Sequence, residues 1–418
     1  MNFESAYSFL KKIKSYEDLV FVKYNKKNFN LDRVRKFLKA FFAELDNVKI
    51  VHVAGSKGKG SVCNMVAQCL VFDTFDEVLV KVKVGMFTSP YIFSVRECFW
   101  VDGKIISEKK FCEYVYELKI FLKKYKGESP TYFEALMGLV FKYFIDCGVN
   151  IAVVEVGMGG RMDATNVVLP EVCALTFMEE EHKGIIGNNL SEILDEKLGI
   201  YKKNVPFLIG KQNKNVYEMI KNKMRGKKEI IFVDEKNIKN KDENDFYDNA
   251  RLASAILKKL ISNFDENNFN NFLKTFKLVG RFDVRKYKGK NIVFDIAHTK
   301  NSMKNLVFKL KQKFSDKKFV FLVSLMIGKD VKNIIKIIAN DAYMIGFCKS
   351  HEIRSESPEK LFLIAQKLGA KRISFCEGFA PIYKDFLQDL KKDQVLVVTG
   401  SHFLVSKAMK DLNYSSFN

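Results

Sequence analysis

A short apolar run that leads through a glycine-rich turn into an apolar helical stretch most constrains how this chain folds. Residues 48–53 read VKIVHV, residues 54–60 read AGSKGKG, and apolar residues then recur through residues 61–71. A buried strand followed by a glycine turn and a helix is the unit from which parallel α/β sheets are built. We therefore expect an α/β fold that contains this unit.

The glycine-rich turn has the properties of a phosphate-binding loop. Glycines let several backbone N–H groups face one point, and the N-terminus of the following helix favours an anion there. Lys59 is placed to reach terminal phosphates, and the Ser61 hydroxyl follows close to where a metal would lie. The loop departs from the common nucleotide-binding pattern, because Gly60 separates the lysine from the hydroxyl. We expect Gly55, Gly58, Lys59, Gly60 and Ser61 to bind nucleotide phosphates.

Short β-branched runs alternate with helical patterns along the rest of the chain. In the first part the expected strands are residues 83–87, 151–156, 173–177 and 207–210, and the expected helices are residues 32–42, 131–147 and 250–260. In the last part the expected strands are residues 292–296, 319–325, 342–347, 372–376 and 394–398. Helices are expected between them at residues 302–314, 332–339, 358–368 and 380–391. This alternation predicts mainly parallel sheets covered on both faces.

The pattern changes between residues 278 and 290, which contain two glycines and several charges. We therefore expect two domains, residues 1–285 and residues 290–418. The first is predicted to be the ATP-binding domain with a mainly parallel sheet. The second is predicted to be a smaller doubly wound, Rossmann-like domain.

Composition excludes several classes of protein. Apolar residues make up 47% of the chain and charged residues 28%, which is the balance of a globular protein and not of a disordered one. The eight cysteines form no C-x-x-C pair, which favours reduced, buried thiols. The first residues, MNFES, lack the basic start of a secretory signal, and the longest apolar run, residues 319–327, is far shorter than the ~20 residues of a membrane span. We expect a cytoplasmic protein.

The net charge of +21 could indicate a nucleic-acid partner. Nearly all of the excess is lysine, however, and it is spread along the chain. Specific phosphate and base readers favour arginine, and a binding face concentrates its charge. We interpret the lysine excess as compositional, and nucleic-acid binding stays open as the alternative. Attraction of a small anionic substrate is compatible with both.

A second motif places a carboxylate at the end of an expected buried strand. Residues 151–166 read IAVVEVGMGGRMDATN, so Glu155 stands directly before three closely spaced glycines. A buried carboxylate is costly unless a cation or hydrogen bonds compensate it. Mg²⁺ beside nucleotide phosphates is one such cation. The alternative is a carboxylate that caps the turn, and Arg161 with Asp163 could likewise form a structural ion pair.

Together these motifs resemble the folylpolyglutamate synthase/dihydrofolate synthase family, which is similar to the Mur ligases. The loop resembles the family's H-V-A-G-T-N-G-K-G-S signature, and residues 159–166, GGRMDATN, resemble its second signature. Further segments match in order along nearly the whole chain: residues 88–90 (TSP), 131–134 (TYFE), 193–202 (ILDEKLGIYK), 280–281 (GR), 295–298 (DIAH) and 399–401 (TGS). The resemblance predicts an ATP- and Mg²⁺-dependent acid–amino-acid ligase.

The resemblance also implies a set of metal ligands. Ser89 and Glu155 would hold one Mg²⁺, and His182 would hold a second. Lys197 matches a lysine that is carbamylated in this family, which turns a cation into a carboxylate-like group near the metals. A buried lysine has a lowered pKa and therefore more of the neutral amine that reacts with CO₂.

The remaining site residues implied by the resemblance concern ATP and catalysis. Arg281 and Asp295 would contact ATP, and Asn249 would lie near the adenine. His298 would lie in the cleft between the domains and act, together with Lys59, His182 and Lys197, in catalysis.

The sequence departs from the family pattern at several places. The Thr-Asn pair of the loop is replaced by Ser56-Lys57, and His-Asn-Pro is replaced by His298-Thr299-Lys300. Residues 328–330, GKD, stand for a D-K-D segment, and residues 23–29, KYNKKNF, stand for a G-L-x-R stretch that contributes to pterin binding. The residues expected to bind phosphate and metal therefore match the family motifs better than the residues expected to bind the pterin.

The resemblance predicts that the chain joins L-glutamate to dihydropteroate, to (tetrahydro)folate or to both, through an acyl phosphate. We favour a bifunctional enzyme that works as a monomer on small-molecule substrates. Two alternatives stay open. One is a Mur-type amino-acid ligase, and the other is a ligase-fold protein that binds nucleic acid without catalysis.

Overall fold

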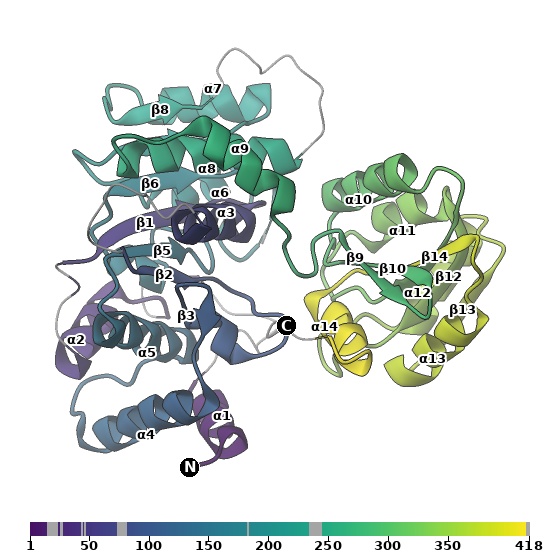
Figure 1. Ribbon diagram of the computed structural model, residues 1–418, viewed down its shortest axis with the longest axis horizontal. Helices are drawn as coiled ribbons and strands as arrows, with labels where there is room; N and C mark the ends of the chain where they lie inside the picture. Colours follow the sequence, from purple (N-terminus) through teal and green to yellow (C-terminus); the bar gives the residue numbers. More distant parts are fainter. Residues whose placement is uncertain are drawn as a thin grey trace. The chain divides into compact units, whose positions relative to one another are not determined.

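The computed structural model describes residues 1–14, 24–25, 28–42, 45, 47–72, 82–181, 184–233 and 245–414. These residues form two compact units (Figure 1). The first unit contains residues 1–91 and 95–276, and the second contains residues 92–94 and 277–418. The units therefore divide at Phe276/Lys277, whereas the sequence pattern placed the boundary at residues 285–290.

The first unit is built on an eight-stranded sheet with the strand order β4-β3-β2-β5-β1-β6-β7-β8. Its strands are β1 (Lys49–Ala54), β2 (Val84–Phe87), β3 (Trp100–Val101), β4 (Lys104–Ile105), β5 (Ile151–Glu155), β6 (Val172–Leu175), β7 (Phe207–Ile209) and β8 (Ile230–Phe232). The six strands from β2 to β8 in this order are parallel, whereas the pairs β2–β3 and β3–β4 are antiparallel. Strand β1, which carries the glycine-rich turn at its end, lies between β5 and β6 near the centre.

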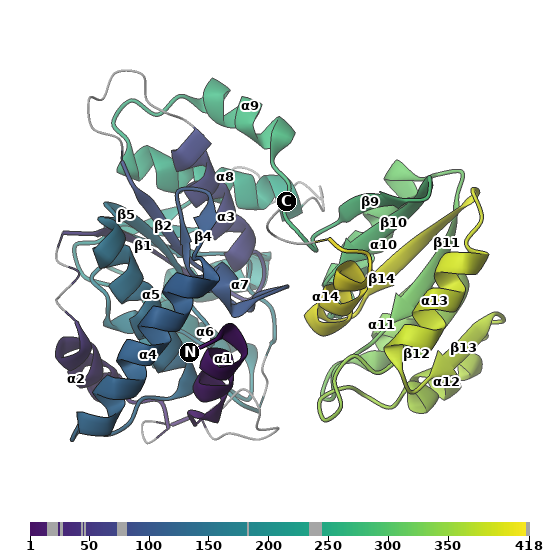
Figure 2. The same ribbon diagram turned by 60° about the horizontal axis from the view of Figure 1, so that its bottom comes forward.

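Helices cover both faces of this sheet (Figure 2). They are α1 (Phe3–Lys12), α2 (Leu31–Phe41), α3 (Lys59–Phe72), α4 (Glu108–Lys124), α5 (Tyr132–Cys147), α6 (Leu190–Leu198), α7 (Lys214–Lys223), α8 (Asp245–Leu260) and α9 (Glu266–Thr275), with two 3₁₀ turns at Val95–Cys98 and Ala164–Val167. Alternate strand residues face opposite sides. Val51 and Val53 of β1 pack with α3, α8 and α9, whereas Ile50 packs on the other face with α2, α4 and α5.

The second unit is a six-stranded sheet with the order β13-β12-β11-β14-β10-β9. Its strands are β9 (Asp283–Tyr287), β10 (Lys290–Asp295), β11 (Lys318–Val323), β12 (Ala342–Cys348), β13 (Ile373–Cys376) and β14 (Gln394–Thr399). Its helices are α10 (Lys300–Lys313), α11 (Val331–Ala339), α12 (Pro358–Lys367), α13 (Phe379–Asp389) and α14 (His402–Asp411). All neighbouring strands are parallel except β9, which pairs antiparallel with β10 at the edge.

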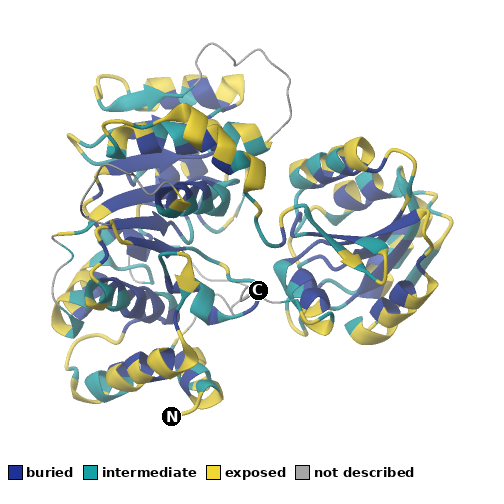
Figure 3. Cartoon of the chain, viewed as in Figure 1, coloured by how far each residue is buried: buried dark blue, intermediate teal, exposed yellow. Residues whose placement is uncertain are grey.

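Both units confirm the predicted fold class. In the second unit α10, α11 and α12 bury one face of the sheet, and α13 and α14 bury the other. The central strands of both sheets are buried, and the outer faces of the helices are exposed (Figure 3). No helix in the described part of the chain is both long enough and apolar enough to cross a membrane.

Candidate functional site

The glycine-rich turn between β1 and α3 has a backbone that only glycine fits at two positions. Gly55 and Gly58 have φ angles of +143° and +89°, which L-residues with a side chain rarely adopt. A Cβ at Gly55 would lie 1.8 Å from the Thr176 hydroxyl oxygen, and a Cβ at Gly58 would lie 2.2 Å from Oδ1 of Asn249. The structure therefore brings Asn249, from α8, directly against the loop that the sequence predicted to bind phosphate.

The loop is also fixed by hydrogen bonds to the segment that follows β6. The backbone N–H groups of Ser56 and Lys57 both donate to the Phe177 carbonyl oxygen, at 3.0 and 3.1 Å. The Lys57 ammonium lies 3.4 Å from Glu179 and 3.7 Å from Glu181. These contacts involve the two positions at which the loop departs from the family signature. The sequence analysis did not foresee them, because the partners are more than a hundred residues away in the chain.

Two lysine side chains converge on one carbonyl oxygen of the loop. Nζ of Lys59 donates to the Gly55 carbonyl oxygen at 3.2 Å, and Nζ of Lys197 donates to the same oxygen at 2.8 Å. Lys197 lies on α6 and is only 2% exposed. Burial, and secondarily the positive charge of Lys59, lowers the pKa of Lys197 to about 7. A substantial fraction of this amine is therefore neutral at neutral pH, which favours its reaction with an electrophile.

The predicted metal ligands Glu155 and Ser89 are adjacent. Glu155 ends β5, next to β1 in the sheet, and is 5% exposed. Its Oε2 accepts a hydrogen bond from the backbone N–H of Ser89 at 3.1 Å. A Cβ at Gly60 would come within 3.4 Å of the same oxygen, so the glycine leaves space between this carboxylate and the start of α3. A carboxylate with an adjacent hydroxyl, beside a phosphate loop, is a donor set that fits Mg²⁺.

The second predicted metal site depends on His182. His182 lies outside the described residues, so its predicted role stays a prediction. Within the described part of the chain, no three His, Cys, Asp or Glu side chains converge on one point. Mg²⁺ at nucleotide sites commonly has few protein ligands, because waters and phosphate oxygens complete its coordination.

The second signature forms a buried network instead of the ion pair considered from the sequence. The Arg161 guanidinium pairs with Glu196 of α6, not with Asp163. Asp163 accepts hydrogen bonds from Thr165 and Met158. The Thr165 hydroxyl also contacts the imidazole of a buried histidine on β1, His52. The sequence analysis assigned no role to this histidine, although a polar residue inside an apolar strand was the available signal.

In the second unit, the predicted ATP contacts lie close together. Asp295 ends β10, and its two carboxylate oxygens accept backbone N–H groups of Phe282 at 2.7 Å and Ala297 at 2.8 Å. Burial raises the pKa of Asp295, and the positive charge of Arg281 opposes this shift. Nδ1 of His298 lies 2.8 Å from the Ile296 carbonyl oxygen.

Further basic side chains surround this end of the second sheet. Burial, together with the charges of nearby His298, Arg354, His351 and Arg281, lowers the pKa of His402 to about 3. The rings of His351 and His402 both pack on Phe403. The sequence analysis missed His351, Arg354 and His402. His351 and Arg354 share the loop after β12, and His402 begins α14, far in the chain from Arg281 and Asp295.

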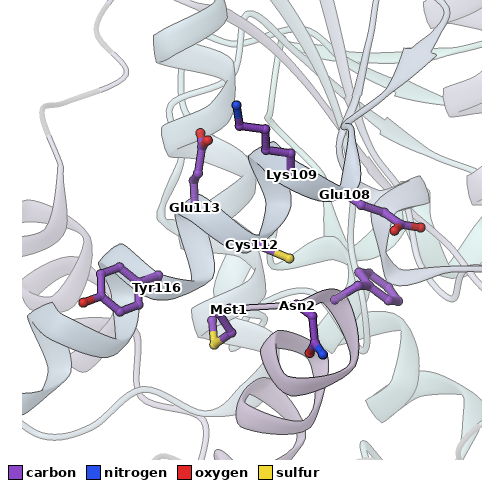
Figure 4. A pocket seen from close by; sticks show the side chains of 8 residues that line it. Met1, Asn2, Glu108, Lys109, Cys112, Glu113 and Tyr116 are labelled. Carbon is purple, nitrogen blue, oxygen red and sulfur yellow. The ribbon is translucent and has the colours of Figure 1, made fainter.

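The first unit thus gathers most of its predicted site residues around one loop: Gly55, Gly58, Lys59, Gly60, Ser61, Ser89, Glu155, Lys197 and Asn249. A surface pocket between the start of α1 and α4 contains none of them (Figure 4). It is lined by Met1, Glu108, Cys112, Tyr116 and their neighbours. That pocket therefore does not contribute to the candidate site.

Comparison with known proteins connects this arrangement to a family. A model described as "Mur ligase, glutamate ligase domain" matches residues 280–402. A folylpolyglutamate synthase of Arabidopsis thaliana is 39% identical over 185 residues, which cover 42% of this chain and 28% of that protein. A dihydrofolate synthetase of Saccharomyces cerevisiae is 26% identical over 339 residues, covering 73% of this chain and 78% of that protein.

Solved structures share the fold along the whole chain. A Mycobacterium tuberculosis folylpolyglutamate synthase complexed with ADP gives a TM-score of 0.81 at 21% identity, covering 99% of this chain and 98% of that one. A folylpolyglutamate synthase from Thermotoga maritima gives 0.77 at 23% identity, covering 100% and 98%. The matches to the first curated relatives span only about a third of those proteins' length. These similarities confirm the predicted family resemblance and the fold.

Proposed function

We propose that this relative of the folylpolyglutamate synthase/dihydrofolate synthase family is an ATP-dependent ligase that adds L-glutamate to a folate-type carboxylate. The acceptor is dihydropteroate, (tetrahydro)folate or both, and the chain acts as a monomer in the cytoplasm. Relatives named for each of the two activities support this substrate class. The observation that carries the proposal is the convergence of Lys59, Lys197, Glu155 and Ser89 on one glycine-rich loop.

The loop and its two lysines would bind the phosphates of ATP. Backbone N–H groups and the N-terminus of α3 favour an anion at the turn. The Lys59 ammonium, which donates to the Gly55 carbonyl oxygen, exchanges that acceptor for phosphate oxygens when nucleotide binds. Asn249 lies against Gly58 and is assigned to the adenine side. Phosphoryl transfer needs mainly positioning and electrostatic stabilisation, which these groups supply.

The second unit contributes Arg281, Asp295 and His298 to the proposal. The backbone N–H bonds to Asp295 fix the direction of its carboxylate, and each oxygen keeps a further lone pair for a ribose hydroxyl. Arg281 is assigned to a phosphate of ATP. His298 is assigned to catalysis.

Ser89 and Glu155 are the residues that would hold Mg²⁺. When bound, this ion neutralises charge that develops on the transferring phosphoryl group. A second ion is assigned to His182 together with a carbamylated Lys197. The burial and lowered pKa of Lys197 support the modification.

The reaction follows from these assignments in two steps. The acceptor carboxylate attacks the γ-phosphorus of ATP, so that an acyl phosphate forms and ADP leaves. The glutamate amine then attacks the acyl carbon, the amide forms, and phosphate leaves while the amine loses a proton. The positive groups around the loop stabilise the charge that develops in the first step.

The direct test uses the purified chain with ATP, Mg²⁺ and L-glutamate, offered dihydropteroate or tetrahydrofolate in separate reactions. We expect ADP and a product heavier by one glutamyl residue with at least one acceptor, and neither with Lys59→Ala. Parallel reactions contain a UDP-muramoyl substrate, or duplex DNA at several salt concentrations. Turnover only with the muramoyl substrate, or salt-dependent DNA binding without ATP turnover, would replace the proposal by one of its two alternatives.

A further inference from the structure

A fully buried histidine occupies the middle of β1, three residues before the phosphate loop. His52 has an exposure of 0%. Its strand neighbours on the same face, Ile50 and Ala54, belong to two different apolar clusters, so the imidazole lies where these clusters meet. Nε2 of His52 lies 2.8 Å from the Thr165 hydroxyl oxygen, and Nδ1 has no hydrogen-bond partner.

The hydrogen-bond network assigns the tautomer of this imidazole. Asp163 Oδ1 accepts the backbone N–H of Thr165 at 2.9 Å and its hydroxyl at 2.5 Å, and Oδ2 accepts the Met158 N–H at 2.9 Å. An ionised Asp163, which already accepts two backbone N–H groups, takes the single Thr165 hydroxyl proton, so the hydroxyl accepts from His52. Nε2 of His52 therefore carries the proton, and Nδ1 is the bare nitrogen. Burial lowers the pKa of His52 to about 3, so the ring stays neutral.

Such a residue is unfavourable for stability. A buried polar atom without a partner costs about 1–3 kcal/mol, whereas an apolar side chain of similar size would avoid that cost. Groups that are kept at a cost to stability occur where function needs them. The hydrogen bonds that run from Nε2–H of His52 to the Thr165 hydroxyl, and from that hydroxyl to Asp163, indicate which groups the imidazole orients.

That path ends at the glycine turn between Glu155 and Arg161. The Asp163 carboxylate binds the N–H of Met158, and a Cβ at Gly157 would come within 3.3 Å of the same carboxylate. On its far side the turn packs on α6. A Cβ at Gly160 would lie 2.6 Å from the Glu196 carbonyl oxygen and 3.1 Å from Cα of Lys197. The turn therefore links the strand end that carries Glu155 to the backbone of Lys197.

We propose that His52 is a positioning residue, whose Nε2–H orients the Thr165 hydroxyl so that Asp163 fixes this glycine turn between Glu155 and Lys197. The proposal rests on the proposed ligase function for its kinetic consequences. The hydrogen-bond arrangement itself does not depend on that function.

The kinetic test compares three substitutions of His52. The amide nitrogen of glutamine reaches about as far as Nε2, whereas that of asparagine reaches only about as far as Nδ1. We expect His52→Leu and His52→Asn to lower kcat by about 10- to 100-fold, because small misplacements of catalytic groups have effects of this size. His52→Gln should recover most of the wild-type kcat. Thr165→Val should reproduce the loss, and adding His52→Leu to it should lower kcat no further, since both act on one path.

Thermal unfolding separates positioning from a merely structural role. His52→Leu removes the unpartnered nitrogen, so its Tm should equal or exceed that of the wild type although its kcat falls. A loss of kcat that follows a loss of Tm, or equal kcat for His52→Gln and His52→Asn, would overturn the proposal. So would an unchanged kcat in His52→Leu.

¹⁵N NMR of the imidazole tests the arrangement without any turnover. We expect a neutral ring protonated at Nε2 between pH 5 and pH 8, the range in which an ordinary histidine titrates. A ring protonated at Nδ1, or an imidazolium near pH 6, would overturn the proposal. If the wild-type chain forms no amide, the proposed function is overturned. The NMR result would still test the hydrogen-bond arrangement of His52 by itself.

Discussion

The Lys197 ammonium donates a 2.8 Å hydrogen bond to the carbonyl oxygen of Gly55, the first glycine of the phosphate loop. Lys59 donates to the same oxygen, so two positive groups share one acceptor in a buried place. This contact ties α6 to the end of β1. Burial, and after it the nearby charge of Lys59, makes Lys197 lose its proton more easily than an ordinary lysine does.

Replacing Lys197 by methionine should stabilise the fold near neutral pH. At pH 6 the amine is charged in the folded and unfolded chains, and burying that charge lowers the free energy of unfolding. From about pH 7 to 10.5 the unfolded chain keeps the proton and the folded chain releases it, so the wild type gains stability with rising pH. The shift from 10.5 to about 7 corresponds to about 5 kcal/mol.

Denaturant unfolding of the wild type and Lys197→Met, without nucleotide, metal or bicarbonate, measures this difference. The variant should be more stable at pH 6, and the gap should shrink toward pH 10. A gap that does not change with pH would show that the amine is not deprotonated in the fold.

A second substitution separates a chemical role of Lys197 from its charge. Lys197→Ala should lower turnover on the order of 10²-fold, by analogy with the loss of one electrostatic stabiliser. Acetate should restore part of the rate by replacing a carbamate. Lys197→Arg keeps the positive charge and should stay inactive. Near wild-type turnover in Lys197→Arg would mean that this residue acts only as a cation.

The two glycines Gly58 and Gly103 form a matched pair for testing the loop. Both have a positive φ, +89° and +81°, but a Cβ at Gly58 meets Asn249, whereas a Cβ at Gly103 meets no atom within 4 Å. Alanine at either position should destabilise the fold by about 1 kcal/mol through backbone strain. Only Gly58→Ala should also raise the KM for ATP. An equal KM in the two variants would remove Asn249 from the nucleotide site.

Glu155→Gln should abolish Mg²⁺-dependent turnover without unfolding the chain. The glutamine oxygen can still accept the Ser89 N–H, and a neutral amide is less costly to bury than a carboxylate. We expect turnover to fall on the order of 10²-fold or more across a Mg²⁺ titration, with an unchanged or higher Tm. Wild-type turnover at saturating Mg²⁺ would exclude Glu155 as a metal ligand.

Most central elements of the fold could be predicted, because their signal is local. Strands β1 and β5 are short β-branched runs buried on both faces, and each was expected within one residue of its observed bounds. Two-residue strands such as β3 and β4 have no periodicity to detect. Strand β9 reads DVRKY and is only partly buried at the sheet edge. Its charged residues resemble those of a linker, so the boundary was expected at residues 285–290, later in the chain than the observed division after Phe276.

The candidate site was predictable where motifs place residues near one another in sequence. Residues 55–61 were predicted from a buried strand that leads through a glycine turn into a helix. Glu155 was predicted because it is a carboxylate at the end of a buried strand. Lys197 needed the family resemblance, since its own segment resembles an exposed lysine-rich helix. The pairs Lys57–Glu179, Arg161–Glu196 and His52–Thr165 join distant segments, and no single-sequence pattern encodes which segments meet.

The central claim is that this chain makes an amide through an acyl phosphate, and oxygen transfer tests it most directly. The acceptor folate is prepared with ¹⁸O in its reacting carboxylate and incubated with the chain, ATP, Mg²⁺ and L-glutamate. The carboxylate oxygen that attacks ATP becomes bonded to phosphorus and leaves with the phosphate when the amide forms. One labelled oxygen therefore moves to phosphate in each turnover. Mass spectrometry should therefore find one ¹⁸O in the phosphate for each glutamyl product. Glutamyl product with unlabelled phosphate, or ATP hydrolysis without any product, would contradict the account.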